Sequence, residues 1–305
     1  LSNSYTERLG KKNRIFTSRI CNTMKMPDLH VLDGGVGKHI MFTALIDKLY
    51  EKNKQKLVIN SVYPEVFTYS PYVADSRTKI NEIIFDTYYN YFRNYDKIFH
   101  YDPYKSDFLK GQKHVLKKWA EMYEIELKNY KPNFAINTER EVELLPHIQK
   151  INKFVLLQFT GGQGVMTNHY DKNNFGRNYR YGQDLIYLLQ EQYPTHIFIV
   201  FGHDNERSEY IGETKFNDQG GSPLFKNRED FMILSKYCDF FISIDSALHH
   251  MCANRTFNKK GLVLWGTTKP EIFGYPDLTN MISEYPYCVE ISPDKIVEAS
   301  IKLND

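Results

Sequence analysis

The sequence has few cysteines, no long apolar run and little excess charge, and each shortage excludes a class of protein. Its four cysteines lie far apart among 305 residues and form no C-x-x-C pair, so we expect reduced thiols without a disulfide framework or zinc knuckle. No apolar run reaches the ~18 residues that span a membrane, and the basic beginning has no signal-peptide pattern. The net charge of +2 neither requires nor excludes nucleic acid. We expect a cytoplasmic protein, with a place at a membrane surface left open.

Several common ligand motifs are also absent. The glycine-rich turn at 33–39 is not a P-loop, because Leu32 and His39 stand where that motif needs Gly and Ser or Thr. It lacks the third glycine of the dinucleotide fingerprint, and the second strand ends at 59–61 without the acidic residue that binds ribose, which argues against a dehydrogenase. There is no D-x-D, the usual metal site of metal-dependent sugar transferases.

Strand and helix patterns alternate along the chain. The length suits two domains of about 150 residues, and the alternation predicts an α/β protein with two Rossmann-like domains and parallel sheets. We place a basic arm at 1–27, an N-terminal domain at 28–150 and a C-terminal domain at 151–305, with the linker between 131 and 153. The arm is interpreted as a solvated strap or as a contact with phosphate. The predicted strands are 29–32, 57–59, 97–100, 154–159, 197–201, 240–244 and 262–265, and the predicted helices 38–53, 108–123, 181–193, 229–237, 246–254 and 293–303.

The first candidate constellation is the turn D-G-G-V-G-K-H at 33–39, between a predicted strand and a predicted helix. Glycines let the backbone turn sharply and approach a ligand, and the helix start offers free N–H groups. A tight strand-to-helix turn is the structural alternative. The members of this turn that we assign to the acceptor side are Gly34, Gly35, Gly37 and His39.

Three further constellations lie in the C-terminal half. At 245–250, D-S-A-L-H-H opens a helix where Ser246 is either an N-cap or a diphosphate contact. His249 and His250 are neighbours on a helix and point about 100° apart, which does not favour one shared metal site. At 262–270, a buried strand ends in a Gly-Thr-Thr loop at the carboxyl edge of the sheet, where open α/β sheets bind ligands. At 174–180, Arg177 and Arg180 are candidates for a phosphate clamp.

The order and spacing of these motifs, from about residue 30 to 275, resembles glycosyltransferase family 9, the ADP-heptosyltransferase-like group. The resemblance implies a GT-B fold with two Rossmann-like domains across a cleft, and an inverting, metal-independent transfer from a nucleoside-diphosphate sugar. It implies no cofactor and no metal. Under it, Arg177 neutralises the leaving group. The expected donor-binding residues are Gly161, Gly162, Arg177, Arg180, Gly202, Asp245, Ser246, Ala247, His249, Gly266 and Thr267.

One departure from the family concerns the general base. The family has Asp directly after the G-x-G turn, where this chain has Lys38. A protonated lysine cannot deprotonate a hydroxyl. Three explanations stay open: another carboxylate, Asp33 or Asp75, is the base; Lys38 binds an acceptor phosphate; or activity is lost.

The expected partners are therefore a nucleotide sugar and an acceptor. The default acceptor is a surface glycan such as lipopolysaccharide. The composition and the G-G-x-G-K opening are also similar to phage-encoded transferases, some of which modify hydroxymethylated DNA bases. A DNA acceptor would give salt-dependent binding and a non-catalytic nucleotide-sugar-binding module would bind without turnover.

Overall fold

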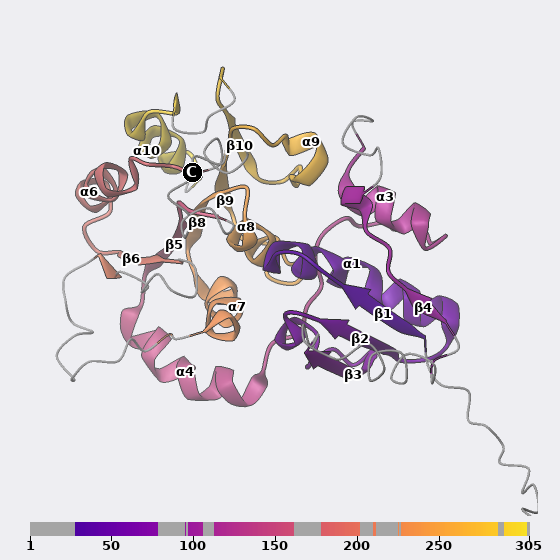
Figure 1. Ribbon diagram of the computed structural model, residues 1–305. Coiled ribbons are helices and arrows are strands. Elements are labelled where there is room, and N and C mark those ends of the chain that lie inside the picture. Colours follow the sequence, from indigo (N-terminus) through magenta and orange to yellow (C-terminus); the bar gives the residue numbers. More distant parts are fainter. Residues whose placement is uncertain are drawn as a thin grey trace, which may run out of the picture.

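The structure is a computed structural model that describes residues 28–78, 95, 97–105, 113–161, 178–201, 210–211, 225, 227–285 and 290–303. The predicted arm at 1–27 lies outside these residues. The described residues form two sheets, one in each half of the chain. Figure 1 shows the two sheets side by side, each with helices packed against it. The prediction of an α/β protein with parallel sheets is confirmed.

The first sheet has the strand order β3-β2-β1-β4, and all of its pairs are parallel. Helix α1 follows β1, and the apolar residues on one of its faces, Ile40, Ala44, Leu45 and Leu49, are all buried. The predicted strands and the first predicted helix are confirmed, whereas the sequence patterns missed β3. The elements of this half are β1 (Leu29–Leu32), α1 (Val36–Asn53), β2 (Leu57–Ser61), η1 (Pro64–Val66), β3 (Val73–Thr78), β4 (Ile98–Phe99), η2 (Pro103–Lys105) and α3 (Val115–Met122).

The second sheet has the order β10-β9-β8-β5-β6-β7, parallel except for the antiparallel pair β6–β7. Its central strands are buried along their whole length, as expected for parallel strands covered on both faces. Prediction missed β7, α9 and β10. The elements are β5 (Phe154–Gln158), α6 (Gly182–Gln192), β6 (Ile197–Val200), β7 (Tyr210–Ile211), α7 (Arg228–Tyr237), β8 (Phe240–Ile244), α8 (Ala247–Cys252), β9 (Gly261–Trp265), α9 (Pro270–Phe273), β10 (Thr279–Ile282) and α10 (Pro293–Ile301).

The segment predicted to be a linker contains helix α4 (Thr138–Ile151). The side chain of Asn137 caps this helix by accepting hydrogen bonds from the backbone N–H groups of Glu139 and Arg140, both at 3.1 Å. Arg140 then binds the buried carboxylate of Asp230 on α7 through two bonds of 2.8 and 3.2 Å. Most of the predicted linker is therefore a helix docked on the C-terminal half. The sequence missed it because its charged residues and Pro146 obscure the apolar face.

The two halves meet where α1 packs against α8 (Figure 1). One hydrophobic cluster runs from β1 and α1 through α8 to β9, so the halves share a core. A Cβ atom on Gly37, in the first turn of α1, would lie 3.1 Å from the His250 ring and 3.6 Å from the Ala247 backbone. The carboxyl ends of β1 and β8 therefore both lie at the interface between the halves, which we call the seam. None of the helices in the described ranges is long and apolar enough to cross a membrane.

Candidate functional site

The turn after β1 has the backbone that its glycines predict. Gly34 has φ +95°, a left-handed conformation that glycine adopts without strain, and α1 begins two residues later. His39 is fully buried and its Nδ1–H donates to the Gly35 carbonyl oxygen at 3.0 Å. Burial lowers the pKa of His39 to about 4, so its imidazole is neutral at physiological pH. This histidine therefore supports the turn from inside the protein, away from solvent.

Lys38 forms a buried ion pair. Its Nζ lies 2.8 Å from Oδ1 of Asp102, and the two side chains are only 9% and 11% exposed. The ammonium also lies over the rings of Tyr104 and Trp119, 5.2 and 6.0 Å from their centroids. Asp102 is held in turn by the Tyr104 N–H, which donates to it at 3.0 Å. Lys38 is thus neutralised and enclosed by its own chain.

A second pair joins the same two segments nearer to solvent. Oδ2 of Asp33 lies 2.8 Å from Nε2 of His100, and these side chains are 31% and 43% exposed. Asp33 follows β1 and His100 follows β4, the strand beside it in the sheet. The turn at 33–38 and the segment at 100–104 are therefore joined twice, once by a buried pair and once by an accessible one.

The opposite side of the seam is the loop between β8 and α8. Ser246 N–H donates to Nδ1 of His249 at 3.2 Å, and Leu248 N–H donates to Oε1 of Gln158 at 2.8 Å. Two backbone donors of the helix start are therefore used within the protein. Gly161, at the end of the neighbouring strand β5, comes so close that a Cβ atom there would lie 2.8 Å from Oγ of Ser246. The structure thus brings Gly161 against Ser246, the residue that precedes Ala247 at the start of α8.

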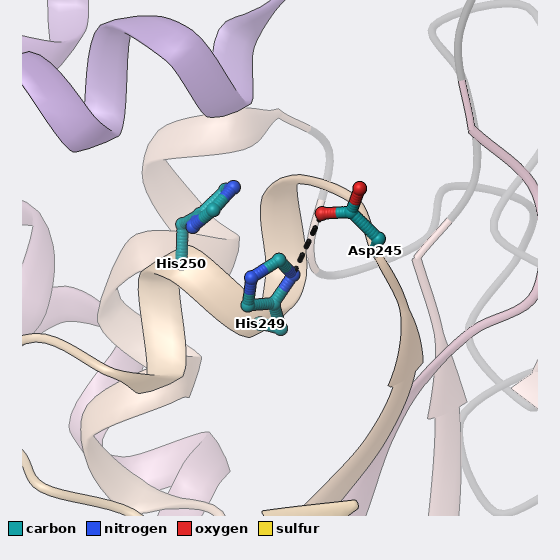
Figure 2. A group of neighbouring side chains, drawn as sticks. All are labelled: Asp245, His249 and His250. Carbon is teal, nitrogen blue, oxygen red and sulfur yellow. Dashed lines mark ion pairs between the residues drawn. The ribbon is translucent and has the colours of Figure 1, made fainter. Parts of the chain in front are cut away.

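Asp245, His249 and His250 form a buried cluster at this loop (Figure 2). Nδ1 of His249 lies 3.8 Å from Oδ1 of Asp245, and the two imidazole centroids are 3.8 Å apart, closer than their helical spacing predicts. Their potential ligand atoms lie within 4.8 Å of one another. However, Nδ1 of His249 accepts the Ser246 N–H, and its Nε2 lies 3.3 Å from the Phe273 carbonyl oxygen. Both nitrogens thus have protein partners, which favours a structural role over metal binding.

The loop around α9 completes the contact between the halves. Tyr104 of η2 stacks on Phe273 with 5.8 Å between ring centroids. Nε2 of His114, at the start of α3, donates to the Gly274 carbonyl oxygen at 3.0 Å. Burial lowers the pKa of His114 to about 4, which keeps this imidazole neutral. The segment at 100–104 is therefore held between its own sheet and α9.

The remaining predicted residues are spread more widely. Gly266 borders a cavity of about 410 Å³ between α9 and the end of β10, and Thr267 is exposed beside it. Asp75 lies inside β3, paired with Val58 near the start of β2 and away from the carboxyl edge. Arg180 is exposed and stacks on Tyr181. Three predicted donor residues lie outside the described residues, namely Gly162, Arg177 and Gly202.

Sequence reasoning missed three residues of the seam: His100, Asp102 and His114. A signal for the first two was available, because His100 ends the predicted strand at 97–100 and Asp102 follows it two residues later, so both stand at the carboxyl edge. His114 falls inside a helix predicted from 108, whereas the observed helix starts at Val115 with His114 as its N-cap.

No family profile and no curated protein matches the chain. Among solved structures, a family 9 glycosyl transferase from Veillonella parvula is similar with a TM-score of 0.62 at 10% identity, covering 91% of this chain and 97% of that one. The ADP-heptose lipopolysaccharide heptosyltransferase II of E. coli is similar with a TM-score of 0.63 at 12% identity, covering 91% of this chain and 98% of that one. The E. coli heptosyltransferase WaaC with ADP is similar with a TM-score of 0.53 at 10% identity, covering 92% of this chain and 100% of that one. The chain has the two-sheet GT-B fold of these proteins.

Proposed function

We propose that this protein is an inverting, metal-independent glycosyltransferase that moves a sugar from a nucleoside-diphosphate sugar to an acceptor hydroxyl. The default acceptor is a surface glycan such as lipopolysaccharide, and the protein acts in the cytoplasm without a cofactor. The domain boundary falls near residue 150. The observation that carries the proposal is the juxtaposition of Gly161, Ser246 and Ala247 with the turn at 33–38, across the seam of a GT-B fold.

The donor diphosphate occupies the loop between β8 and α8. The Ser246 hydroxyl and backbone N–H groups of the loop are its hydrogen-bond donors, and Gly161 leaves room for it to approach the backbone. Because Ser246 N–H and Leu248 N–H already have protein partners, the loop supplies less positive charge than an open helix start. Arginine side chains, Arg177 among them, neutralise the remaining negative charge of the diphosphate.

The similarity to heptosyltransferases indicates the class of the donor. WaaC has been solved with ADP, and the E. coli heptosyltransferase II uses ADP-heptose. ADP is therefore the first nucleotide to test. The rival function, a non-catalytic nucleotide-sugar-binding module, is favoured by one observation: the residue at the family's base position, Lys38, is buried in an ion pair.

A thermal-shift panel with ADP, UDP, GDP and CDP tests the donor site, with and without duplex DNA at low and high salt. A ligand at about 100 times its dissociation constant adds roughly 2.7 kcal/mol of stability, which is easily measured. We expect one diphosphate to stabilise the protein. Added stabilisation by DNA only at low salt would replace the glycan acceptor with DNA. No shift with any diphosphate at millimolar concentration would refute the proposal.

Two serine variants locate the binding. Ser246 and Ser292 each precede a helix of the C-terminal half, α8 and α10 respectively. A hydrogen bond to a charged group contributes about 1.5–3 kcal/mol, so Ser246→Ala should weaken diphosphate binding about tenfold or more. Ser292→Ala, the matched control, should leave it unchanged.

A further inference from the structure

We propose that His100 is the general base of the transfer and that Asp33 positions it. This inference rests on the glycosyltransferase function proposed above. Lys38 stands where family 9 has its aspartate base, so the base must come from another residue. We place the proton acceptor on the loop after β4 instead of on helix α1.

The geometry of the pair fits a base and its orienting partner. Nε2 of His100 lies 2.8 Å from Oδ2 of Asp33. A carboxylate there accepts the Nε2–H, which fixes the tautomer and leaves the lone pair on Nδ1. Imidazole is the commonest general base, and a third group that orients it is the usual arrangement.

The location of the pair fits as well. Asp33 and His100 directly follow β1 and β4, adjacent parallel strands, and so stand at the carboxyl edge of the first sheet. The turn that begins at Asp33 reaches α8 four residues later, where a Cβ atom on Gly37 would lie 3.1 Å from the His250 ring and 3.6 Å from the Ala247 backbone. The pair therefore stands on the acceptor side of the seam, next to the loop proposed for the donor diphosphate.

Accessibility distinguishes this pair from its neighbour. The Lys38–Asp102 pair is nearly closed to solvent, and its two charges neutralise each other. The His100–Asp33 pair is about a third to two fifths exposed, so an acceptor hydroxyl can reach it. Lys38 and Asp102 hold the segment at 100–104 in place, and His100 exchanges the proton.

The step balances without a further reactant. The acceptor oxygen forms a bond to the anomeric carbon as the bond from that carbon to the diphosphate oxygen breaks. The proton of the acceptor hydroxyl passes to Nδ1 of His100, which becomes imidazolium beside the Asp33 carboxylate. The leaving diphosphate keeps the electron pair of the broken bond.

The experiment measures release of nucleoside diphosphate from ADP-heptose, UDP-glucose and GDP-mannose, with water as the hydroxyl donor, together with the thermal shift by ADP, UDP and GDP. The variants are His100→Gln, which keeps a donor for Asp33 but cannot take a proton, Asp33→Asn and the double variant. His196→Gln is the matched control, because His196 also lies near an aspartate, Asp239 at 3.9 Å, but before β6 at the opposite edge of a sheet.

His100→Gln should slow release ~100-fold or more, the usual contribution of a general base, with unchanged diphosphate binding. Asp33→Asn should slow it less, and the double variant should match His100→Gln, because both residues act on one proton transfer. In a further variant, His100→Ala, added imidazole should restore part of the rate of diphosphate release. A His100→Gln rate within about threefold of wild type would overturn the inference while the donor site stands. A wild-type protein that binds no diphosphate and releases none would instead refute the parent proposal.

Discussion

Replacing Asp102 with asparagine removes one charge of the buried Lys38–Asp102 pair and keeps the acceptor that the Tyr104 N–H uses. At 2.8 Å and an effective dielectric constant of 20, the attraction within the pair is about 6 kcal/mol. Desolvation of both ions offsets much of it, so the net value of the pair is small. Removing one partner is different, because the other charge then stays buried without compensation, which costs about 3–5 kcal/mol.

The assay is urea denaturation of Asp102→Asn, Lys38→Met and the double variant. Each single change should lower the free energy of unfolding by about 3 kcal/mol or more. The double variant should be more stable than either single variant, because it leaves no unpaired charge. Single changes that each cost under about 1 kcal/mol, or costs that simply add in the double variant, would refute the conclusion that this pair is buried and mutually neutralised.

Three further outcomes follow from the same structure. Burial lowers the pKa of His30 to about 3 and those of His39 and His114 to about 4, so between pH 6.5 and 4 the unfolded chain binds more protons than the folded one. The free energy of unfolding, measured in urea, should therefore fall as pH drops through this window, by up to about 1.4 kcal/mol per unit for each histidine; a flat profile would contradict their burial. Gly161→Ala should weaken diphosphate binding in calorimetry, since its Cβ would lie 2.8 Å from Oγ of Ser246, and unchanged affinity would remove this glycine from the site. Dialysis against EDTA should leave diphosphate release unchanged, and a loss restored by a divalent ion would contradict metal independence and make the cluster of Figure 2 the first candidate for the metal site.

The fold was predictable because its central strands are short apolar runs with at most one polar residue each. The run at 240–244 is too short for a helix, and strand β8 spans the residues that the pattern predicts. Strands β3 and β10 escaped prediction because they lie at sheet edges, where polar residues such as Asp75 and Asn280 are tolerated. Helix α4 escaped because only its Leu144, Ile148 and Ile151 are buried.

The candidate site was predictable only in part. Residues that follow strands in short turns, such as Gly37 and Ser246, were found because the carboxyl edge of a parallel sheet is a known ligand position. The pairing of Lys38 with Asp102 and of Asp33 with His100 was not predictable, because it depends on the adjacency of β1 and β4, strands that are far apart in the sequence. Pair partners of this kind follow from sheet order, which local patterns do not encode.

Hydrogen exchange with and without ADP, or with whichever diphosphate stabilises the protein, is the most direct test of a donor site at the loop between β8 and α8. We expect slower exchange of the backbone amides in peptides that cover Ser246 to Cys252 and Phe159 to Gly161, at the seam between the halves. We expect no change in α10, which packs with α6 in a hydrophobic cluster separate from that of α8. Protection confined to segments away from the β8–α8 loop, or absent at saturating diphosphate, would contradict a donor site at that loop.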